Sequence, residues 1–222
     1  MKLSKRLTQI EQMVTSGYAH IWDCCCDHGF LGAALLSRHA TTPIHFVDIV
    51  PELMAELKNK LHRFYTNSRW ETHCLDVAKL PLEQYKGNHL IIIAGVGGDL
   101  MIQFIEAIYQ KHSGVDIDFL LCPVHHQYAL RQKLIELKFG LKNEVLIEDN
   151  QRFYEVIHIS SVLDGNDKIS PIGDRIWQSD SDKQTDIIGQ YLDKTLNHYQ
   201  RIGRGNRANV QHIIDAYRLV RE

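Results

Sequence analysis

The sequence has no apolar run long enough to cross a membrane. Its longest runs, such as Leu90–Val96, fall far short of the roughly 20 residues that a membrane-spanning helix requires. The basic N-terminus leads into an amphipathic stretch, not into an apolar segment with a small-residue cleavage site, so no secretory signal is expected. We therefore expect a cytoplasmic protein that makes no membrane contact.

Proline and glycine are also scarce, with five and 14 among 222 residues, and this scarcity excludes a low-complexity or fibrous chain. The 44% hydrophobic and 23% charged residues are typical of a globular protein with one full core and an appendage. Positive charge is not in excess, since the formal net charge is −2. A nucleic-acid partner would therefore have to meet a local positive field.

Cysteine occurs in a pattern that excludes a disulfide framework. The five cysteines are an odd number and three of them are adjacent, so we expect reduced thiols that pack as small apolar groups. Their spacing from one another and from nearby histidines does not match paired C-x-x-C zinc motifs, so no metal site is predicted. The residues considered for it are Cys24, Cys25, Cys26, Cys74, Cys122, His125 and His126.

Short apolar runs alternate with amphipathic helical patterns through the first 162 residues, after an opening helix over 3–14. This alternation predicts an α/β domain with a mostly parallel sheet and right-handed crossovers. The runs at 141–147 and 153–162 predict an antiparallel pair that closes the sheet. The parallel strands are expected at 21–26, 43–47, 70–75, 90–94 and 117–122, and the helices between and after them at 30–39, 51–65, 99–111 and 126–138.

A polar, turn-forming stretch at Leu163–Asp167 predicts a boundary, after which strand patterns stop. Helical patterns at 174–202 and 206–220, joined by Gly203-Arg204-Gly205, predict a hairpin of two helices with facing apolar sides. The last 22 residues carry a net charge of +3. We therefore expect two domains, residues 1–162 and residues 163–222, the second a locally basic α-helical hairpin.

Ligands of open α/β sheets bind beyond the carboxyl ends of the strands, where this sequence places Asp27, Asp48, Asp76 and the Gly95–Gly98 loop. No G-x-G-x-x-G motif follows the first strand, so binding of a dinucleotide pyrophosphate is disfavoured. A ligand with a ribose and a positive centre, such as S-adenosylmethionine, suits these acidic ends better. Asp48 is placed to accept hydrogen bonds from the ribose hydroxyls, and Asp76 from the adenine amine.

Five short motifs strengthen this interpretation. They are Ser4-Lys5-Arg6-Leu7, Asp23-x-Cys25-x-Asp27-His28-Gly29-Phe30-Leu31, Ile93-Ala94-Gly95-Val96-Gly97-Gly98, Leu121-Cys122-Pro123 and Phe153-Tyr154-Glu155-Val156. In order and spacing they resemble the bacterial TrmK-type tRNA (adenine-N1)-methyltransferases, which modify adenine 22 of the D arm. The resemblance spans about residues 1–160, and the tail after Ile172 looks like the helical hairpin of that family.

The resemblance implies a class I, Rossmann-like methyltransferase fold with S-adenosylmethionine as methyl donor and tRNA as acceptor. The cofactor-binding residues that we expect are Asp23, Cys25, Asp27, His28, Asp48, Asp76, Gly95, Val96, Gly97 and Gly98. The family usually has glycine at the position of Cys25 and Gln-Pro-Asn at the position of Cys122-Pro123-Val124. Two alternatives therefore stay open: a methyltransferase of another RNA or of a small molecule, and a catalytically inactive RNA-binding relative.

Methyl transfer to adenine N1 moves positive charge onto the base, and a carboxylate near the acceptor would stabilise that charge. Asp27 is the first candidate for this role and Asp99 the second, while His28 is a candidate to orient the base or to take a proton. The reaction requires no metal, and the state of association is left open. The candidate phosphate contacts are Lys5, Arg6, Arg131, Lys133, Arg201, Arg204 and Arg207.

Overall fold

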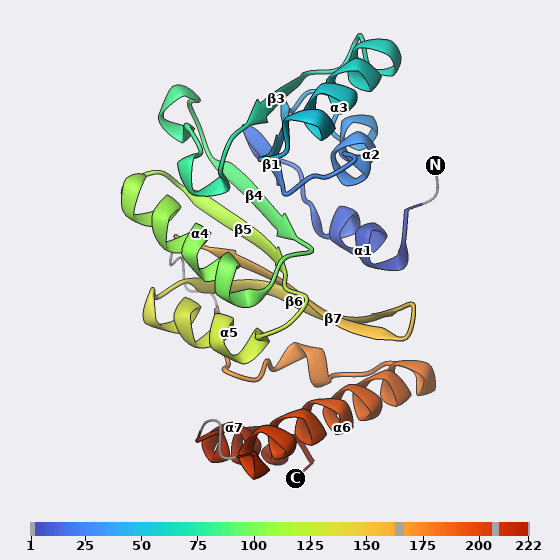
Figure 1. Cartoon of the computed structure of the whole chain (residues 1–222), viewed down its shortest axis with the longest axis vertical. Helices are drawn as coiled ribbons and strands as arrows, with labels where there is room; N and C mark the ends of the chain where they lie inside the picture. Colours follow the sequence, from blue (N-terminus) through green and yellow to red (C-terminus); the bar gives the residue numbers. More distant parts are fainter. Residues whose placement is uncertain (1–2, 163–166, 206–208, 222) are drawn as a thin grey trace.

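The structure is a computed structural model, and it describes residues 3–162, 167–205 and 209–221. One eight-stranded sheet runs through the molecule in the order β3-β2-β1-β4-β5-β7-β6-β8 (Figure 1). The first five strands in the chain are parallel, whereas β7 runs antiparallel to both β5 and β6. The strands are β1 (His20–Cys24), β2 (Ile44–Asp48), β3 (Trp70–Cys74), β4 (His89–Ala94), β5 (Ile117–Cys122), β6 (Gly140–Asp149), β7 (Arg152–Ser160) and β8 (Asp167–Lys168).

Helices cover both faces of this sheet. The helices α1 (Lys5–Met13), α2 (Phe30–Arg38) and α3 (Pro51–Phe64) pack on one face, and α4 (Gly98–Lys111) and α5 (Gln127–Glu136) pack on the other (Figure 1). The central strands β4 and β5 are almost wholly buried, as their continuous apolar sequences predict. The predicted α/β class with a mostly parallel sheet is confirmed.

Two details of the sheet differ from the sequence prediction. β1 ends at Cys24, so Cys25 and Cys26 lie in the loop that follows, because the backbone there turns toward α2. A further short strand, β8, pairs with β6 beyond the expected end of strand structure, although a two-residue strand carries too little pattern to be detected. The expected boundary between residues 162 and 163 adjoins residues 163–166, which lie outside the described residues, and the division into two domains stays a prediction.

The C-terminal hairpin is present as α6 (Asp182–Arg204) and α7 (Gln211–Arg218), with short 3-10 turns at Arg175–Trp177 and Leu219–Arg221. The helix α6 begins later than predicted because the Ser181 side chain caps it by accepting a hydrogen bond from the backbone N–H of Gln184. Leu192 and Leu196 of α6 pack against Ile214 and Tyr217 of α7.

A buried ion cluster fastens this hairpin to the sheet. The Arg131 guanidinium on α5 lies 2.7 Å from Glu155 on β7 and 2.7 Å from Glu144 on β6, and all three side chains are inaccessible to solvent. The Tyr191 hydroxyl of α6 donates to the other oxygen of Glu155 at 2.5 Å. Glu144 accepts from the backbone N–H groups of residues 174 and 175, so both carboxylates bind the C-terminal region as well as Arg131.

Candidate active site

The loop between β1 and α2 turns sharply at the carboxyl end of the sheet. Cys25, Asp27 and Gly29 have φ values of 57°, 49° and 71°, which lie in the left-handed region. Glycine occupies this region without strain and aspartate does so more readily than most residues, but a cysteine there is unfavourable. The backbone strain at Cys25 explains why glycine is the expected residue at this position.

Asp48 joins this loop to the next one. Its Oδ2 accepts a hydrogen bond from the Asp27 backbone N–H at 3.1 Å, and its Oδ1 accepts from the Val50 backbone N–H at 3.1 Å. Asp76 lies at the end of β3, where its Oδ1 accepts from the Ala78 N–H at 3.0 Å and caps a 3-10 turn. Both aspartates therefore stabilise loops by accepting hydrogen bonds from backbone N–H groups, at the carboxyl edge of the sheet where the sequence predicts them.

Asp23 differs from the other acidic residues because it lies inside β1 and is buried. Its Oδ2 accepts from the Gly32 backbone N–H at 2.8 Å. A Cβ atom at Gly32 would lie 2.9 Å from this oxygen and 2.2 Å from the Phe46 ring, so only glycine permits the close approach of α2 to β1. The pKa of Asp23 is raised to about 7, mainly by burial; the hydrogen bond from the Gly32 N–H opposes this rise, and the nearby Asp48 adds to it.

The four residues of the loop after β4 have two different surroundings. Gly95, with a φ of 88°, and Val96 face the same cleft as the β1–α2 loop. A Cβ at Gly97 would lie 2.1 Å from the His125 ring, and one at Gly98 would lie 2.6 Å from the backbone oxygen of residue 126. Gly97 and Gly98 therefore allow the loop to pack against the β5–α5 connection, and they do not line the cleft.

The cleft between these loops and α1 has a volume of about 250 Å³. Arg6 and Leu7 of α1 form one of its walls, and sequence reasoning did not assign either residue to the cofactor site. Their position within the first of the five motifs was the signal that could have identified them. The residues that line the cleft are Arg6, Leu7, Asp23, Cys24, Cys25, Cys26, Asp27, His28, Phe30, Leu31, Ala94, Gly95 and Val96.

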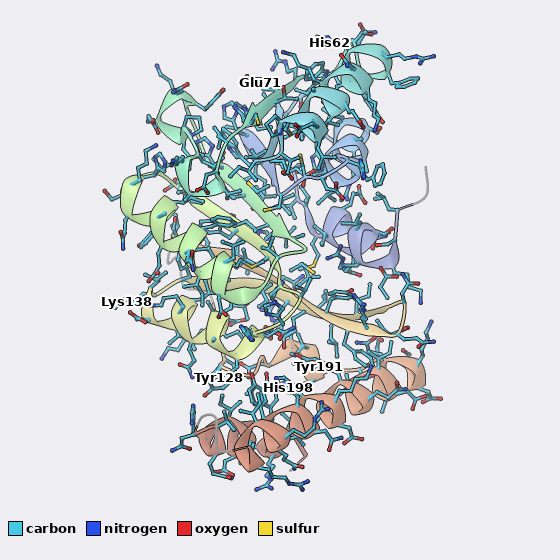
Figure 2. The ribbon with its side chains drawn as sticks, in the orientation of Figure 1. His62, Glu71, Tyr128, Lys138, Tyr191 and His198 are labelled. Carbon is cyan, nitrogen blue, oxygen red and sulfur yellow. The ribbon has the colours of Figure 1, made fainter. Side chains whose placement is uncertain are left out.

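A second, larger groove of about 630 Å³ lies between the β6–β7 turn, the start of α5 and the C-terminal hairpin. Figure 2 shows Tyr128, Tyr191 and His198 from the two sides of this region. Asp99 lies here and not in the first cleft, and its carboxylate is 2.6 Å from Nδ1 of His126. Other residues of the groove are Arg152, Phe153, Tyr154, Lys194 and Tyr199.

The Arg6 side chain lies where the cleft and the groove meet. Its guanidinium lies 5.0 Å from the centre of the Tyr154 ring, in a cation–π contact. Because Arg6 lines the cleft and Tyr154 lines the groove, this pair forms the wall between them. The structure thus places Asp27 and His28 on one side of the wall, and Asp99 on the other.

The thiols of this region are protonated and apolar in character. Burial raises the pKa of Cys25 to about 12, and burial also raises the pKa of Cys122 to about 12 although Arg6 opposes this shift. All five cysteines are free of disulfides, as predicted. Protonated thiols are poor nucleophiles, so Cys25 and Cys122 do not provide covalent catalysis.

Arg131 and Lys133, two of the seven candidate phosphate contacts, form ion pairs with carboxylates of this chain. Arg131 is buried in the ion cluster with Glu144 and Glu155, so its assignment as a surface cation is wrong. Lys133 is held by Glu106 at 3.1 Å and by Glu136 at 2.8 Å. Arg207 lies outside the described residues.

Within the described part of the chain, no helix combines the length and the apolar character that a bilayer span requires.

A largely parallel sheet in which β7 runs antiparallel to β5, with an acidic loop after β1 and a cleft at the carboxyl ends of β1 and β4, defines a Rossmann-like methyltransferase domain. The methyltransferase-domain family matches residues 3–157, so the chain belongs to that family. Among curated proteins, the chain is similar to the tRNA (adenine(22)-N(1))-methyltransferase of Bacillus subtilis (strain 168). The two are 26% identical over 199 residues, which cover 89% of this chain and 77% of the relative.

Solved structures show the same fold over the whole chain. The crystal structure of the B. subtilis m1A22 tRNA methyltransferase TrmK superposes with a TM-score of 0.74 at 20% identity, over 100% of this chain and 99% of that one. The M. capricolum TrmK structure, in complex with S-adenosyl-homocysteine, gives a TM-score of 0.75 at 18% identity over 98% and 97% of the chains. The predicted resemblance to TrmK-type proteins and the predicted fold are confirmed.

Proposed function

We propose that this chain is an S-adenosylmethionine-dependent methyltransferase that modifies N1 of adenine 22 in tRNA. The observation that carries the proposal is the cleft in which the loops after β1 and β4 meet, bordered directly by a second groove large enough for a nucleobase. The similarity to the B. subtilis enzyme, whose name specifies this reaction, supports the choice of acceptor.

The residues of the cleft fit the donor. Its volume of about 250 Å³ lies just below the range for small-molecule sites, roughly 300–1,000 Å³. Gly95 leaves one wall without a side chain. Asp48 does not itself line the cleft, but it is joined to the cleft residue Asp27 by a hydrogen bond. It uses two of its roughly four acceptor positions on backbone N–H groups, which leaves acceptors for ribose hydroxyls. When bound, S-adenosylmethionine supplies an electrophilic methyl group on a sulfonium.

The chain's own residues align the acceptor and stabilise its developing charge. Asp27 and His28 stand at the mouth of the cleft with 3.6 Å between Oδ1 and Nε2, and both are substantially exposed. A carboxylate in this place stabilises positive charge as it arrives on adenine N1. Asp99, paired with His126 in the neighbouring groove, is the candidate to hold the base from its other side.

The groove and α6 supply surfaces for the rest of the RNA. Aromatic rings at Phe153 and Tyr154 offer stacking contacts, and Lys194 lies at the rim. Lys194 also belongs to a shallow depression on α6 together with Arg201 and Arg204. Cations in such a surface contact phosphates and orient the RNA without reading its sequence.

The proposal is tested by incubating the purified protein with methyl-labelled S-adenosylmethionine and bulk tRNA, then digesting the tRNA to nucleosides. We expect labelled 1-methyladenosine, and its position is checked with transcripts in which adenine 22 is replaced by guanine. Calorimetry with S-adenosylmethionine tests the donor separately. Donor binding without labelled 1-methyladenosine would reject the acceptor, whereas absence of donor binding at millimolar concentration would reject methyl transfer altogether.

A further inference from the structure

A cluster of histidines occupies one face of the sheet near the amino ends of its strands, away from the proposed active site. His20 on β1 lies opposite His89 on β4, and His45 on β2 lies opposite Glu71 on β3. His73 follows on the same face of β3, because side chains two residues apart along a strand point the same way. No part of the proposed methyl transfer uses these residues.

Three of these side chains converge on one point. His45 Nδ1 lies 3.0 Å from His73 Nε2, and His73 Nε2 lies 3.9 Å from Oε2 of Glu71. Among the described residues, His45, Glu71 and His73 form a group whose ligand atoms all lie within 4.8 Å of one another. Two imidazoles and one carboxylate are the protein ligands of many open zinc sites.

The surrounding residues hold this group in place. His45 Nε2 lies 2.9 Å from His20 Nδ1, and the His45 ring stacks on Trp22 with 4.0 Å between ring centres. The Tyr85 hydroxyl donates to Oε2 of Glu71 at 2.6 Å. Such outer contacts fix the tautomer and orientation of metal-binding histidines and carboxylates in metalloproteins.

We propose that His45 Nδ1, His73 Nε2 and the Glu71 carboxylate form a binding site for a divalent transition-metal ion of the zinc type, which fastens the edge strand β3 to β2. The remaining coordination position is left to water, since the Glu71 side chain is half exposed while His45 is buried. Glu71, labelled in Figure 2, lies on β3, the edge strand of the sheet.

The distances agree with this assignment after a small adjustment. Ligand atoms about 2.0–2.1 Å from a tetrahedral zinc ion lie about 3.3 Å apart, so the two imidazole nitrogens must separate slightly and Glu71 must approach. In the tautomer in which His73 donates its Nε2 proton to His45 Nδ1, binding of the ion requires His73 to carry that proton on Nδ1 instead. His45 Nε2 faces His20 Nδ1, so when His45 carries its proton on Nε2 the lone pair of its Nδ1 is available to the ion.

The direct experiment is titration of the full-length, chelator-treated protein with Co²⁺, followed by visible absorption, and then displacement of Co²⁺ by Zn²⁺. We expect d–d absorption that saturates at one equivalent and disappears on addition of Zn²⁺. His73→Gln and Glu71→Gln are each expected to weaken Co²⁺ affinity at least tenfold. His62→Gln is the matched control, because His62 is an exposed histidine of the adjacent α3 that lies outside the cluster.

Thermal unfolding gives a second measurement. Zn²⁺ should raise the melting temperature of the unmodified chain and of the His62 variant, but not that of the His73 and Glu71 variants, because an ion that binds only the folded state stabilises it. Circular dichroism without metal checks that the variants fold. Equal Co²⁺ affinity in the unmodified chain and in His73→Gln would overturn the proposal. So would a near-ultraviolet thiolate-to-cobalt band that Cys74→Ser abolishes, since the ion would then be bound by cysteine.

Discussion

A buried cluster of charged side chains and an exposed set, whose members lie on the two sides of the Arg6–Tyr154 wall, differ in almost every physical respect. Arg131, Glu144 and Glu155 are inaccessible to solvent, and each carboxylate has several donors. Asp27 and Asp99, by contrast, have side chains that are 67% and 62% exposed, and each lies beside one exposed histidine. The first cluster joins the hairpin to the sheet, and the second borders the cleft and the groove.

The comparison shows that a cluster of buried, ion-paired side chains does not by itself identify an active site. The buried cluster contains short ion pairs, but none of its three side chains is accessible to a substrate. The exposed carboxylates keep vacant acceptor positions at the sheet edge where ligands of this fold bind. Substitutions in the two clusters should therefore affect different properties, stability in one case and turnover in the other.

The largest effect is expected for Arg131→Met. It leaves Glu144 and Glu155 buried without their cation, and loss of one partner of a buried ion pair costs about 3–5 kcal/mol in the free energy of unfolding. Urea denaturation measures this change. Lys133→Met, on the same helix, is the control, because its partly exposed ion pairs are screened by solvent and contribute little to stability. Equal destabilisation by both variants would remove the distinction drawn between the clusters.

A pH-dependent effect is expected at Asp23, the one buried carboxylate of the cleft. Its folded-state pKa of about 7 exceeds the usual value, so between about pH 4 and pH 7 the folded state holds more protons than the unfolded state. The free energy of unfolding must then fall as pH rises through this window, by roughly 2 kcal/mol between pH 5 and pH 7.

Asp23→Asn should remove this slope while keeping an acceptor for the Gly32 N–H. Urea titrations at pH 5, 6 and 7 measure the slope in both proteins. Asp116→Asn, at an exposed position before β5, serves as control and should retain the unmodified slope. Parallel pH curves for the unmodified chain and Asp23→Asn would show that Asp23 does not titrate in this range.

In the exposed cluster, Asp27→Asn should lower the rate of methyl transfer at least tenfold, equivalent to about 1.4 kcal/mol of transition-state stabilisation. Asparagine tolerates the left-handed backbone at this position, so the fold should be unchanged. Single-turnover kinetics with labelled donor and tRNA measure the rate, and Asp116→Asn again supplies the control. A near-normal rate would move the charge-stabilising role to Asp99.

Much of this architecture can be predicted from the sequence because its signals are local. Buried parallel strands read as continuous apolar runs, and the acidic residues and glycines after them mark the ligand edge of the sheet. The different surroundings of Gly95 and Gly97 could not be predicted, since they depend on where the His125 ring lies. The role of Arg131 could not be predicted either, because its partners Glu144 and Glu155 lie on β6 and β7 and come into contact with it only through the tertiary fold.

The histidine cluster shows a second limit. His45 and His73 are 28 residues apart, and only the strand order β3-β2-β1-β4 brings them into contact. Each lies within a predicted strand, so alternation along the strands was the signal that could have placed them on a common face. Motif spacing, which is the usual guide to metal sites, detects only ligands that are close together in sequence.

The smallest effect is expected for Cys25→Gly. Glycine would relieve the strain of the left-handed backbone, but it would also give the unfolded chain more conformational freedom. The two contributions oppose each other, so the free energy of unfolding should change by less than about 1 kcal/mol. Because the Cys25 side chain lines the cleft, its removal should tighten binding of S-adenosylmethionine a few-fold, as measured by calorimetry.

Cys74→Ser is the matched control, because Cys74 is an exposed cysteine on β3 that does not line the cleft. It should leave donor affinity unchanged. If Cys25→Gly weakened donor binding, the thiol would be a contact of the cofactor and not an obstruction. Cys25→Gly therefore distinguishes a thiol that contacts the cofactor from a thiol that narrows the cleft. The measurement requires only the donor, so its result does not depend on which acceptor the protein methylates.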